Sequence, residues 1–291
     1  MKALNFYGAI AMLCILVTSC TGASHKDAML LVSQADSLTS QGDYTLALKL
    51  LDSVDNAYTA DLEARKEVLE VRRKAQLVES QQVLAQLDSM APLLEDSIRQ
   101  AAEPFIAEQN KVYDTPLLMT LPVLSKDRNP MVSYLRAQTD TMGNLIFTSV
   151  YYGPKALNHD AIELEAKGET AVAYKTAAVK YDGGLNYRFK DGGLFAELVT
   201  YPRKDAVELS DVIEKADTLN KPIQMTYYGS GAQTKVQSFT LSGPRVKALA
   251  QTVRLAQLYD HRFTLRRMQR THAIRIERIE AKIDSVAHSR K

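Results

Sequence analysis

The spacing of apolar residues changes twice along this chain, and this change restricts the fold more than any other feature of the sequence. Apolar side chains recur every three or four residues over 26–111 and again over 242–287, which is the period of a helix face. Between these regions, 131–243 breaks into short segments rich in Val, Ile, Thr, Tyr and Phe that partly alternate, as β-strands do. The pattern predicts an α+β protein with helices at both ends and a β-rich domain inserted between them.

The first helical region predicts a hairpin of two helices. One apolar face runs from Leu30 to Leu38, Gln41-Gly42-Asp43 interrupts it, and the face resumes from Ala47 to Val54. Two helices joined by a short glycine-containing turn form an αα-hairpin. A longer helix is expected over 61–89. Pro92 falls where a further helix would begin, because proline is tolerated in a first turn.

The stretch "SQGDYTLALKLLDSV" within this region resembles the second half of a tetratricopeptide unit. Ala35 and Ala47 match the small residues of its two helices, Gly42-Asp43-Tyr44 matches the turn, and Thr59 stands where the terminal proline is expected. A faint second copy, "VLAQLDSM" at 83–90, lacks the turn. Because about three units are needed to bury a continuous core, we expect a small helical bundle rather than a peptide-binding array.

Eight segments of the middle region have strand character, and glycine-containing turns separate them. Seven or eight strands joined by tight turns predict a mainly antiparallel, β-sandwich-like domain. A helical pattern over 205–216 interrupts the strands, with Asp205 as N-cap and Glu208 at the capping-box spacing. The strand segments are 134–139, 145–152, 161–166, 170–176, 185–189, 194–201, 223–228 and 235–241.

The last region predicts one long helix over 242–287, with Ser242 as its cap and Pro244 in its first turn. Its two apolar stripes are out of heptad phase, so a break near Asp260-His261 is an alternative. About 44 residues at ~1.5 Å each reach roughly 65 Å, which is longer than a small domain. We therefore expect this helix to pack on the N-terminal helices.

The first twenty residues resemble a bacterial lipoprotein signal. The apolar run Phe6–Val17 is too short to span a bilayer, which takes about 20 residues, and Val17-Thr18-Ser19-Cys20 reads as a lipobox. The resemblance implies cleavage before Cys20 and acylation of its thiol and of its new amino group. Cys14 lies in the leader and is the only other cysteine, so the mature chain has no disulfide.

These patterns divide the chain into five parts, with three prolines marking a linker. The parts are a signal peptide at 1–19, a tetratricopeptide-like helical region at 20–111, a linker at 112–130, a β-rich domain with one inserted helix at 131–243, and a long helix at 244–291.

No local motif predicts catalysis, a cofactor or a metal site. Asp182-Gly183-Gly184 and Asp191-Gly192-Gly193 precede strand-like runs, so they indicate hairpin turns rather than phosphate or calcium loops. The five histidines are too scattered to form a local metal motif. The net charge of +2 gives no reason to expect a nucleic-acid partner.

Two groups of side chains are candidates for binding. The repeated "YYG" places Tyr151, Tyr152, Tyr227 and Tyr228 at strand ends, where they would form an aromatic rim for a glycan or another small ligand; the alternative is that they are ordinary strand residues. Arg262, Arg266, Arg267 and Arg270 cluster in a tail that carries ten Lys or Arg against four Asp or Glu. They would contact lipid headgroups, an acidic partner or Glu63, Glu67 and Glu70, and a solvated charged face is the alternative.

The order of lipobox, helices with the phrases "ADSL" and "LLDSV", β domain and terminal helix resembles uncharacterised lipoproteins of Bacteroidetes-type bacteria. This resemblance brings no activity with it. We expect a non-enzymatic, lipid-anchored interaction or scaffold protein with an envelope protein as partner. Because no acidic run follows Cys20, we expect it in the outer membrane facing the periplasm. A glycan- or small-ligand-binding lipoprotein is the alternative, and an enzyme with a site built from distant residues is the third hypothesis.

Overall fold

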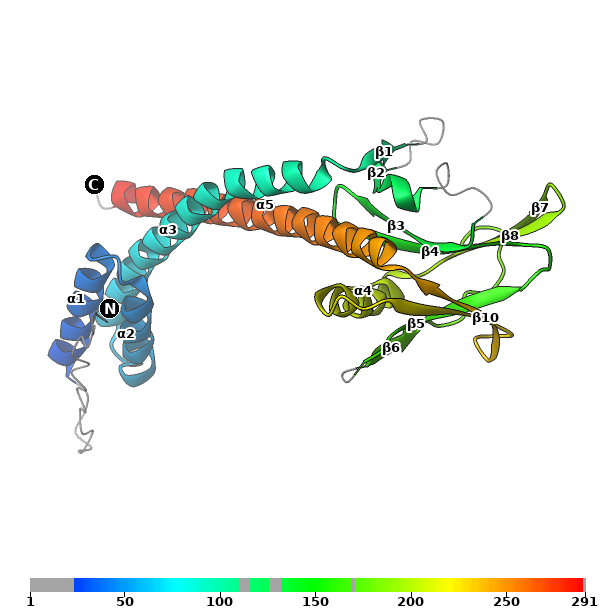
Figure 1. Cartoon of the computed structure of the whole chain (residues 1–291). Coiled ribbons are helices and arrows are strands. Elements are labelled where there is room, and N and C mark those ends of the chain that lie inside the picture. The colour runs from blue at the N-terminus through cyan, green and yellow to red at the C-terminus, as the bar shows by residue number, and fades with distance from the viewer. Residues whose placement is uncertain (1–23, 110–115, 126–131, 169–170, 290–291) are drawn as a thin grey trace, which may run out of the picture. The chain divides into compact units, whose positions relative to one another are not determined.

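A computed structural model describes residues 24–109, 116–125, 132–168 and 171–289 (Figure 1). The chain forms two compact units. Of the described residues, those up to Val83 and from Ala273 onward form the helical unit, and those within Leu84–His272 form the sheet unit. This division differs from the expected one, because the second half of the third helix belongs with the sheets.

The helical unit contains the expected αα-hairpin. Helix α1 (His25–Ser40) and helix α2 (Tyr44–Ala57) are joined by a turn in which Gly42 adopts a φ of +84°. The side chain of Asp43 caps α2 by accepting a hydrogen bond from the Leu46 N–H at 3.1 Å. Ala35 and Ala47 are fully buried, as the tetratricopeptide resemblance predicts for the small residues of the two helices.

Helix α3 (Leu62–Ala102) and helix α5 (Gly243–Ser289) each contribute to both units. In the helical unit Arg275 pairs with Glu79 at 3.2 Å, and in the sheet unit Ile98 packs against Leu255 and Tyr259. The predicted packing of the C-terminal helix on the N-terminal helices is therefore confirmed. Helix α5 is continuous, so the alternative break at residues 260–261 does not occur.

The expectation that a new helix begins at Pro92 is wrong, because Pro92 lies inside the single helix α3. A proline in a helix interior removes one backbone hydrogen bond and usually ends or kinks the helix. Here Leu94 and Ile98 follow it and pack against α5. We attribute the persistence of the helix to this packing, since tertiary contacts supply most of the stability of helices in proteins.

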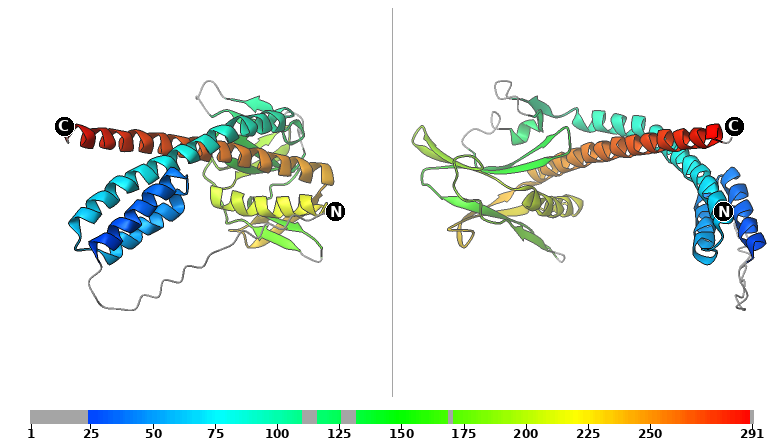
Figure 2. Two further views of the ribbon diagram at one scale, coloured as in Figure 1. Left: turned by 90° about the vertical axis from the view of Figure 1, so that its left-hand side faces the viewer. Right: turned by 180° about the vertical axis from the view of Figure 1, so that it is seen from behind.

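The sheet unit holds two antiparallel sheets, and all eight predicted strands are present. The sheets share one apolar core, and α4 (Arg203–Thr218) and the first turns of α5 lie between them (Figures 1 and 2). The six-stranded sheet has the order β1-β2-β3-β4-β8-β7 and the four-stranded sheet the order β10-β9-β5-β6. The strands are β1 Ile106–Glu108, β2 Leu118–Thr120, β3 Tyr134–Asp140, β4 Leu145–Gly153, β5 His159–Ala166, β6 Val172–Lys175, β7 Asn186–Asp191, β8 Leu194–Thr200, β9 Ile223–Gly229 and β10 Thr234–Leu241.

Two short strands occupy segments that were expected to be helix or linker. Strand β1 lies in the predicted helical region, and strand β2, which pairs with β1 and β3, lies in the predicted linker at 112–130 together with the 3₁₀ turn η1 (Pro122–Leu124). The side-chain amide of Gln138 on β3 joins all three strands, because it donates to Thr120 Oγ1 at 2.8 Å and to Glu108 Oε2 at 3.2 Å. These side-chain contacts join residues far apart in the sequence. We attribute the formation of such short strands to them.

The predicted N-cap at Asp205 is wrong. Helix α4 begins after Pro202, and Asp205 is buried in its first turn, where its carboxylate accepts hydrogen bonds from the Tyr174 hydroxyl at 2.8 Å and the Ala177 N–H at 3.2 Å. Its hydrogen bond with Tyr174, together with burial, raises the pKa of that tyrosine to about 12. Asp205 therefore connects α4 to the four-stranded sheet instead of capping its own helix.

The two Asp-Gly-Gly steps differ from each other. Asp191-Gly192-Gly193 is the predicted hairpin turn between β7 and β8, with a positive φ at both glycines. Asp182-Gly183-Gly184 is not a hairpin turn, because no strand ends at it. There the Asp182 carboxylate accepts hydrogen bonds from the backbone N–H groups of Gly184 and Asn186.

Candidate functional site

An apolar groove in the sheet unit runs between the second half of α3 and the middle of α5. Its cavity is about 390 Å³, and its lining is almost entirely apolar. On each helix most of the lining residues are three or four positions apart, which places them on one side. Met90, Leu93 and Met268 are 55%, 68% and 41% exposed. The other residues that line the groove are Leu87, Leu94 and Leu265 and the polar Ser97, His261 and Thr264.

Two of the four clustered arginines hold the sheet unit together. The Arg262 guanidinium donates to the Thr141 backbone carbonyl at 2.7 Å, lies 3.5 Å from the Glu95 carboxylate and stacks over the Tyr259 ring at 4.8 Å. Arg266 pairs with the same Glu95 at 2.8 Å. The acidic partner of these arginines is thus Glu95 on α3, and not one of the three glutamates expected at 63, 67 and 70.

The other two arginines, Arg267 and Arg270, face solvent. Both are exposed, and neither makes an ion pair or a side-chain hydrogen bond with any residue that the structure describes. A pair of unpaired cations on α5 thus accompanies the apolar groove on the same helix. The helix period places both arginines on a different side of α5 from the residues that line the groove.

The expected rim of four tyrosines does not form, because two of them belong to the core. Tyr151 and Tyr227 are buried and meet edge to face at 6.1 Å, and their hydroxyls donate to the Lys155 and Val150 carbonyls. Strand alternation turns the other two away from the core. Tyr228 donates to Glu163 Oε2 at 2.7 Å on the four-stranded sheet, and Tyr152 lies on the six-stranded sheet in a pocket described below.

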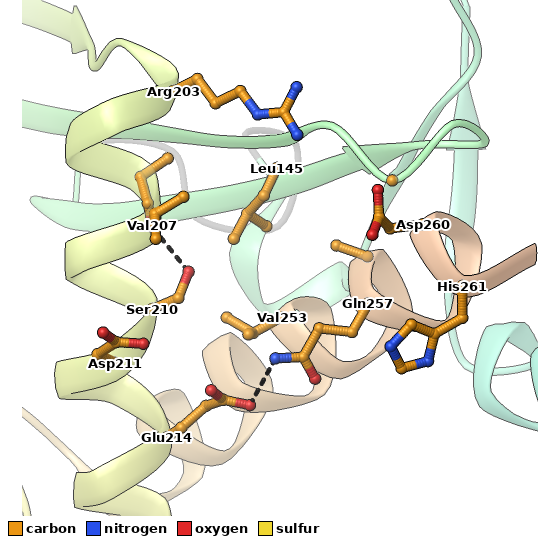
Figure 3. A pocket seen from close by; sticks show the side chains of 13 residues that line it. Leu145, Arg203, Val207, Ser210, Asp211, Glu214, Val253, Gln257, Asp260 and His261 are labelled. Atoms are coloured by element: carbon orange, nitrogen blue, oxygen red, sulfur yellow. Dashed lines mark hydrogen bonds between the residues drawn. The ribbon is translucent and has the colours of Figure 1, made fainter. Parts of the chain in front are cut away.

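Figure 3 shows a small polar cleft between α4 and α5, with a cavity of about 210 Å³. Leu145 and Val253 lie at its apolar base, and Arg203 and Asp260 lie at its rim. Gln257 reaches across the cleft and donates to Glu214 at 2.9 Å. None of its charged side chains is buried, so water can solvate them. The cleft therefore shows no group that requires a ligand.

A buried polar chain between the sheets has the order of groups found in serine hydrolases. The Tyr201 hydroxyl lies 2.7 Å from Ser149 Oγ, which is 2.8 Å from His159 Nε2, and His159 Nδ1 is 2.8 Å from Glu197 Oε2. An ionised carboxylate only accepts, so Nδ1 carries the proton. Ser149 and His159 are fully buried. Because both side chains are closed off from solvent, we assign this series of hydrogen bonds to joining β4, β5 and β8.

Glu197 is the best connected group of this buried chain. Its carboxylate accepts four hydrogen bonds, from the backbone N–H groups of Leu157, Asn158 and His159 and from the His159 ring. Burial alone would raise the pKa of Glu197, but the hydrogen bonds from His159 and from these N–H groups outweigh burial and lower it below its ordinary value. The group is therefore held as a carboxylate.

Cys20 lies outside the residues that the structure describes. Among the described residues, no helix is long and apolar enough to cross a membrane, and no three His, Cys, Asp or Glu side chains are grouped so as to hold a metal ion. Comparisons of the chain with protein-family models, with curated proteins and with solved structures found no match.

Sequence reasoning identified the region of the groove through the arginines but missed the groove itself and the buried polar chain. The sequence does contain one signal for the buried series of hydrogen-bonded side chains. Ser149 lies between Phe147 and Tyr151 at alternating positions of β4, so a polar residue occupies a core-facing position. Such a residue needs a buried hydrogen-bond partner.

Proposed function

We propose that this protein is a lipid-anchored, non-enzymatic interaction protein of a bacterial envelope, and that it binds an amphipathic helix of an envelope protein in the groove between α3 and α5. The observation that carries the proposal is the exposed apolar lining of this groove. The proposed location is the outer membrane, facing the periplasm.

The groove has the chemistry of a helix-binding surface. Amphipathic helices bind by laying their apolar face into a hydrophobic groove, with anchors spaced by three or four residues. Methionines such as Met90 and Met268 adapt to differently shaped anchors because their side chains are unbranched and polarizable. Leu93 is more than half exposed beside them. A cluster of large apolar side chains on a surface marks an interaction site.

The net charge of helix α5 favours an acidic partner. Arg267 and Arg270 are exposed without an acidic neighbour in the described chain, and the segment from Arg254 to Lys291 carries a net charge of +6. Complementary charge speeds association and excludes partners of like charge. The partner helix is therefore one whose polar side carries Asp or Glu.

The anchor is tested by the mass of the native protein. We expect the wild-type chain to lack residues 1–19 and to carry the added mass of acyl chains at Cys20. The Cys20→Ala variant should show neither change, because it lacks the acylated thiol. Cys14→Ala should retain both changes, since residue 14 is removed with the leader. Intact-mass spectrometry that returns the unmodified wild-type chain with its leader would contradict the anchor.

The groove is tested by introducing a charge into it. The Leu93→Glu variant should lose at least tenfold of the co-purifying envelope partner, about 1.4 kcal/mol or more, because a carboxylate would be buried against apolar side chains on binding. Leu69→Glu is the matched control, since Leu69 lies on the same helix, is 52% exposed and is remote in sequence from the groove residues. Quantitative mass spectrometry of the protein purified in mild detergent provides the comparison.

Both substitutions are at exposed positions, so each should change the free energy of unfolding by no more than about 0.5 kcal/mol. A partner that is lost with Leu93→Glu and kept with Leu69→Glu supports the proposal. The same set of co-purifying proteins from the wild type and from both variants would show that the groove is not the binding surface.

A further inference from the structure

A second concave surface lies on the six-stranded sheet, on the face opposite the core. Its cavity is about 310 Å³, near the lower end of the range for small-molecule sites, which begins at about 300 Å³. Four adjacent strands build it in register: Tyr134 pairs with Val150, Val150 with Leu198, and Leu198 with Tyr187. The row therefore has aromatic rings at its two ends and shorter aliphatic side chains in the middle.

Further aromatic rings complete the wall of this pocket. Tyr152 and Phe189 lie two residues further along their strands, and each pairs with Ala196 of β8. The small side chain of Ala196 leaves room between the two rings. The Tyr187 and Phe189 rings lie 5.4 Å apart and are tilted towards each other by 35°. Aromatic faces of this kind stack against flat or ring-shaped ligands.

Arg136 lines the same pocket, and its charge has no partner among the residues that the structure describes. Its Nε is buried without a hydrogen bond, and its guanidinium makes no ion pair or hydrogen bond with any residue in the described ranges. Removing a polar or charged group from water without a partner is costly. A carboxylate is the ligand group that a guanidinium fork fits best, because it accepts two parallel hydrogen bonds.

The hydroxyls in the pocket indicate the rest of the ligand. The hydroxyls of Tyr152 and Tyr187 form no hydrogen bond with the described part of the chain, unlike those of Tyr151, Tyr227 and Tyr228. Tyr134 is only 1% exposed, so it forms the floor of the pocket. A ligand that uses them must carry several donors and acceptors as well as a ring. We propose that this pocket binds the uronic-acid residue of an acidic saccharide, with the carboxylate on Arg136 and the sugar ring against Tyr152 and Tyr187.

This inference goes beyond the proposed function, because the pocket is built from β3, β4, β7 and β8 and shares no residue with the helical groove. The probe is digalacturonic acid at pH 7, compared with its methyl ester, which keeps the rings and hydroxyls and removes the charge. Ligand-observed NMR titration of the full chain in detergent gives the affinities. We expect the ester to bind at least tenfold more weakly than the acid.

Variants then assign the binding to the pocket. Arg136→Gln should weaken binding of the acid at least tenfold and leave binding of the ester unchanged, and Tyr187→Ala should weaken both. Arg203→Gln, an exposed arginine on α4, is the matched control and should have no effect. Equal affinity for acid and ester, no binding of either, or tighter binding of benzoate than of digalacturonic acid would each overturn the proposal. The comparison of acid and ester on the wild type decides the question even if a variant fails to fold.

Discussion

Glu197→Ala is expected to lower the free energy of unfolding of the sheet unit by about 3–5 kcal/mol, because several buried donors would lose their acceptor at about 1–3 kcal/mol each. The substitution leaves the His159 ring and three backbone N–H groups without their acceptor between the sheets. Urea denaturation followed by tyrosine fluorescence measures the effect, because the chain has no tryptophan and nine of its 14 tyrosines lie between residues 131 and 243.

Glu165→Ala is the control for this variant. Glu165 lies on β5, and its nearest cation is Lys167 at 3.9 Å on the surface. Its loss should cost less than about 1 kcal/mol, as for other exposed pairs. If both variants unfold at the same urea concentration, the buried carboxylate does not join the sheets as described.

The effect of Glu197 also depends on pH. The pKa of Glu197 is lower in the folded chain than its ordinary value of 4.5. Its contribution to the free energy of unfolding is therefore complete above pH 4.5 and is lost as the pH falls through the folded pKa. The difference in stability between the wild type and Glu197→Ala should therefore be largest near pH 7 and shrink in acid. A difference that grows towards acid pH would contradict this assignment.

Gly143→Ala is the second substitution with a large expected effect, at about 2–5 kcal/mol from backbone strain and overpacking together. Gly143 lies in the turn between β3 and β4 with a φ of +86°, and an added Cβ would stand 2.6 Å from the Asp260 backbone nitrogen and 2.7 Å from the Ala256 carbonyl oxygen of α5. Both contacts are with backbone atoms of a helix, which cannot move away as a flexible side chain can.

Gly193→Ala is the control that separates backbone strain from the contact of the added Cβ with α5. Gly193 has nearly the same φ, +88°, and has no atom within 4 Å of an added Cβ. It should therefore show only the strain of a left-handed residue, about 1–3 kcal/mol. Thermal or urea denaturation of the two variants should place Gly143→Ala clearly below Gly193→Ala in stability. Equal losses would show that the turn does not press on α5.

The strands were predictable where the signal was local. Strands β3 to β10 each combine β-branched or aromatic residues with a nearby turn, and each appears where the sequence predicts it. Strands β1 and β2 have three residues each, too few to show a period. They depend on Gln138, which lies 18 residues after Thr120 and 30 residues after Glu108. A contact of this kind leaves no local pattern to find.

The binding surfaces were less predictable than the strands. Alternation correctly divides each tyrosine pair between two faces, but it does not say which face meets the core, and that decides the roles of Tyr151 and Tyr152. The groove requires the register of α3 against α5. That register depends on contacts such as Arg266 with Glu95, which are 171 residues apart in the chain. That Arg136 has no partner among the described residues likewise appears only from the folded arrangement of β3, β4, β7 and β8.

Site-specific photo-crosslinking from the groove tests the central claim most directly. The lipidated chain, carrying p-benzoylphenylalanine in place of Leu93, is irradiated in its native membrane and the crosslinked peptide is identified by mass spectrometry. We predict a crosslink to one envelope protein, within an amphipathic helix that has Asp or Glu on its polar side, and none from the same probe in place of Leu69. Equal crosslinking from both positions, or no protein crosslink from position 93, would contradict the account.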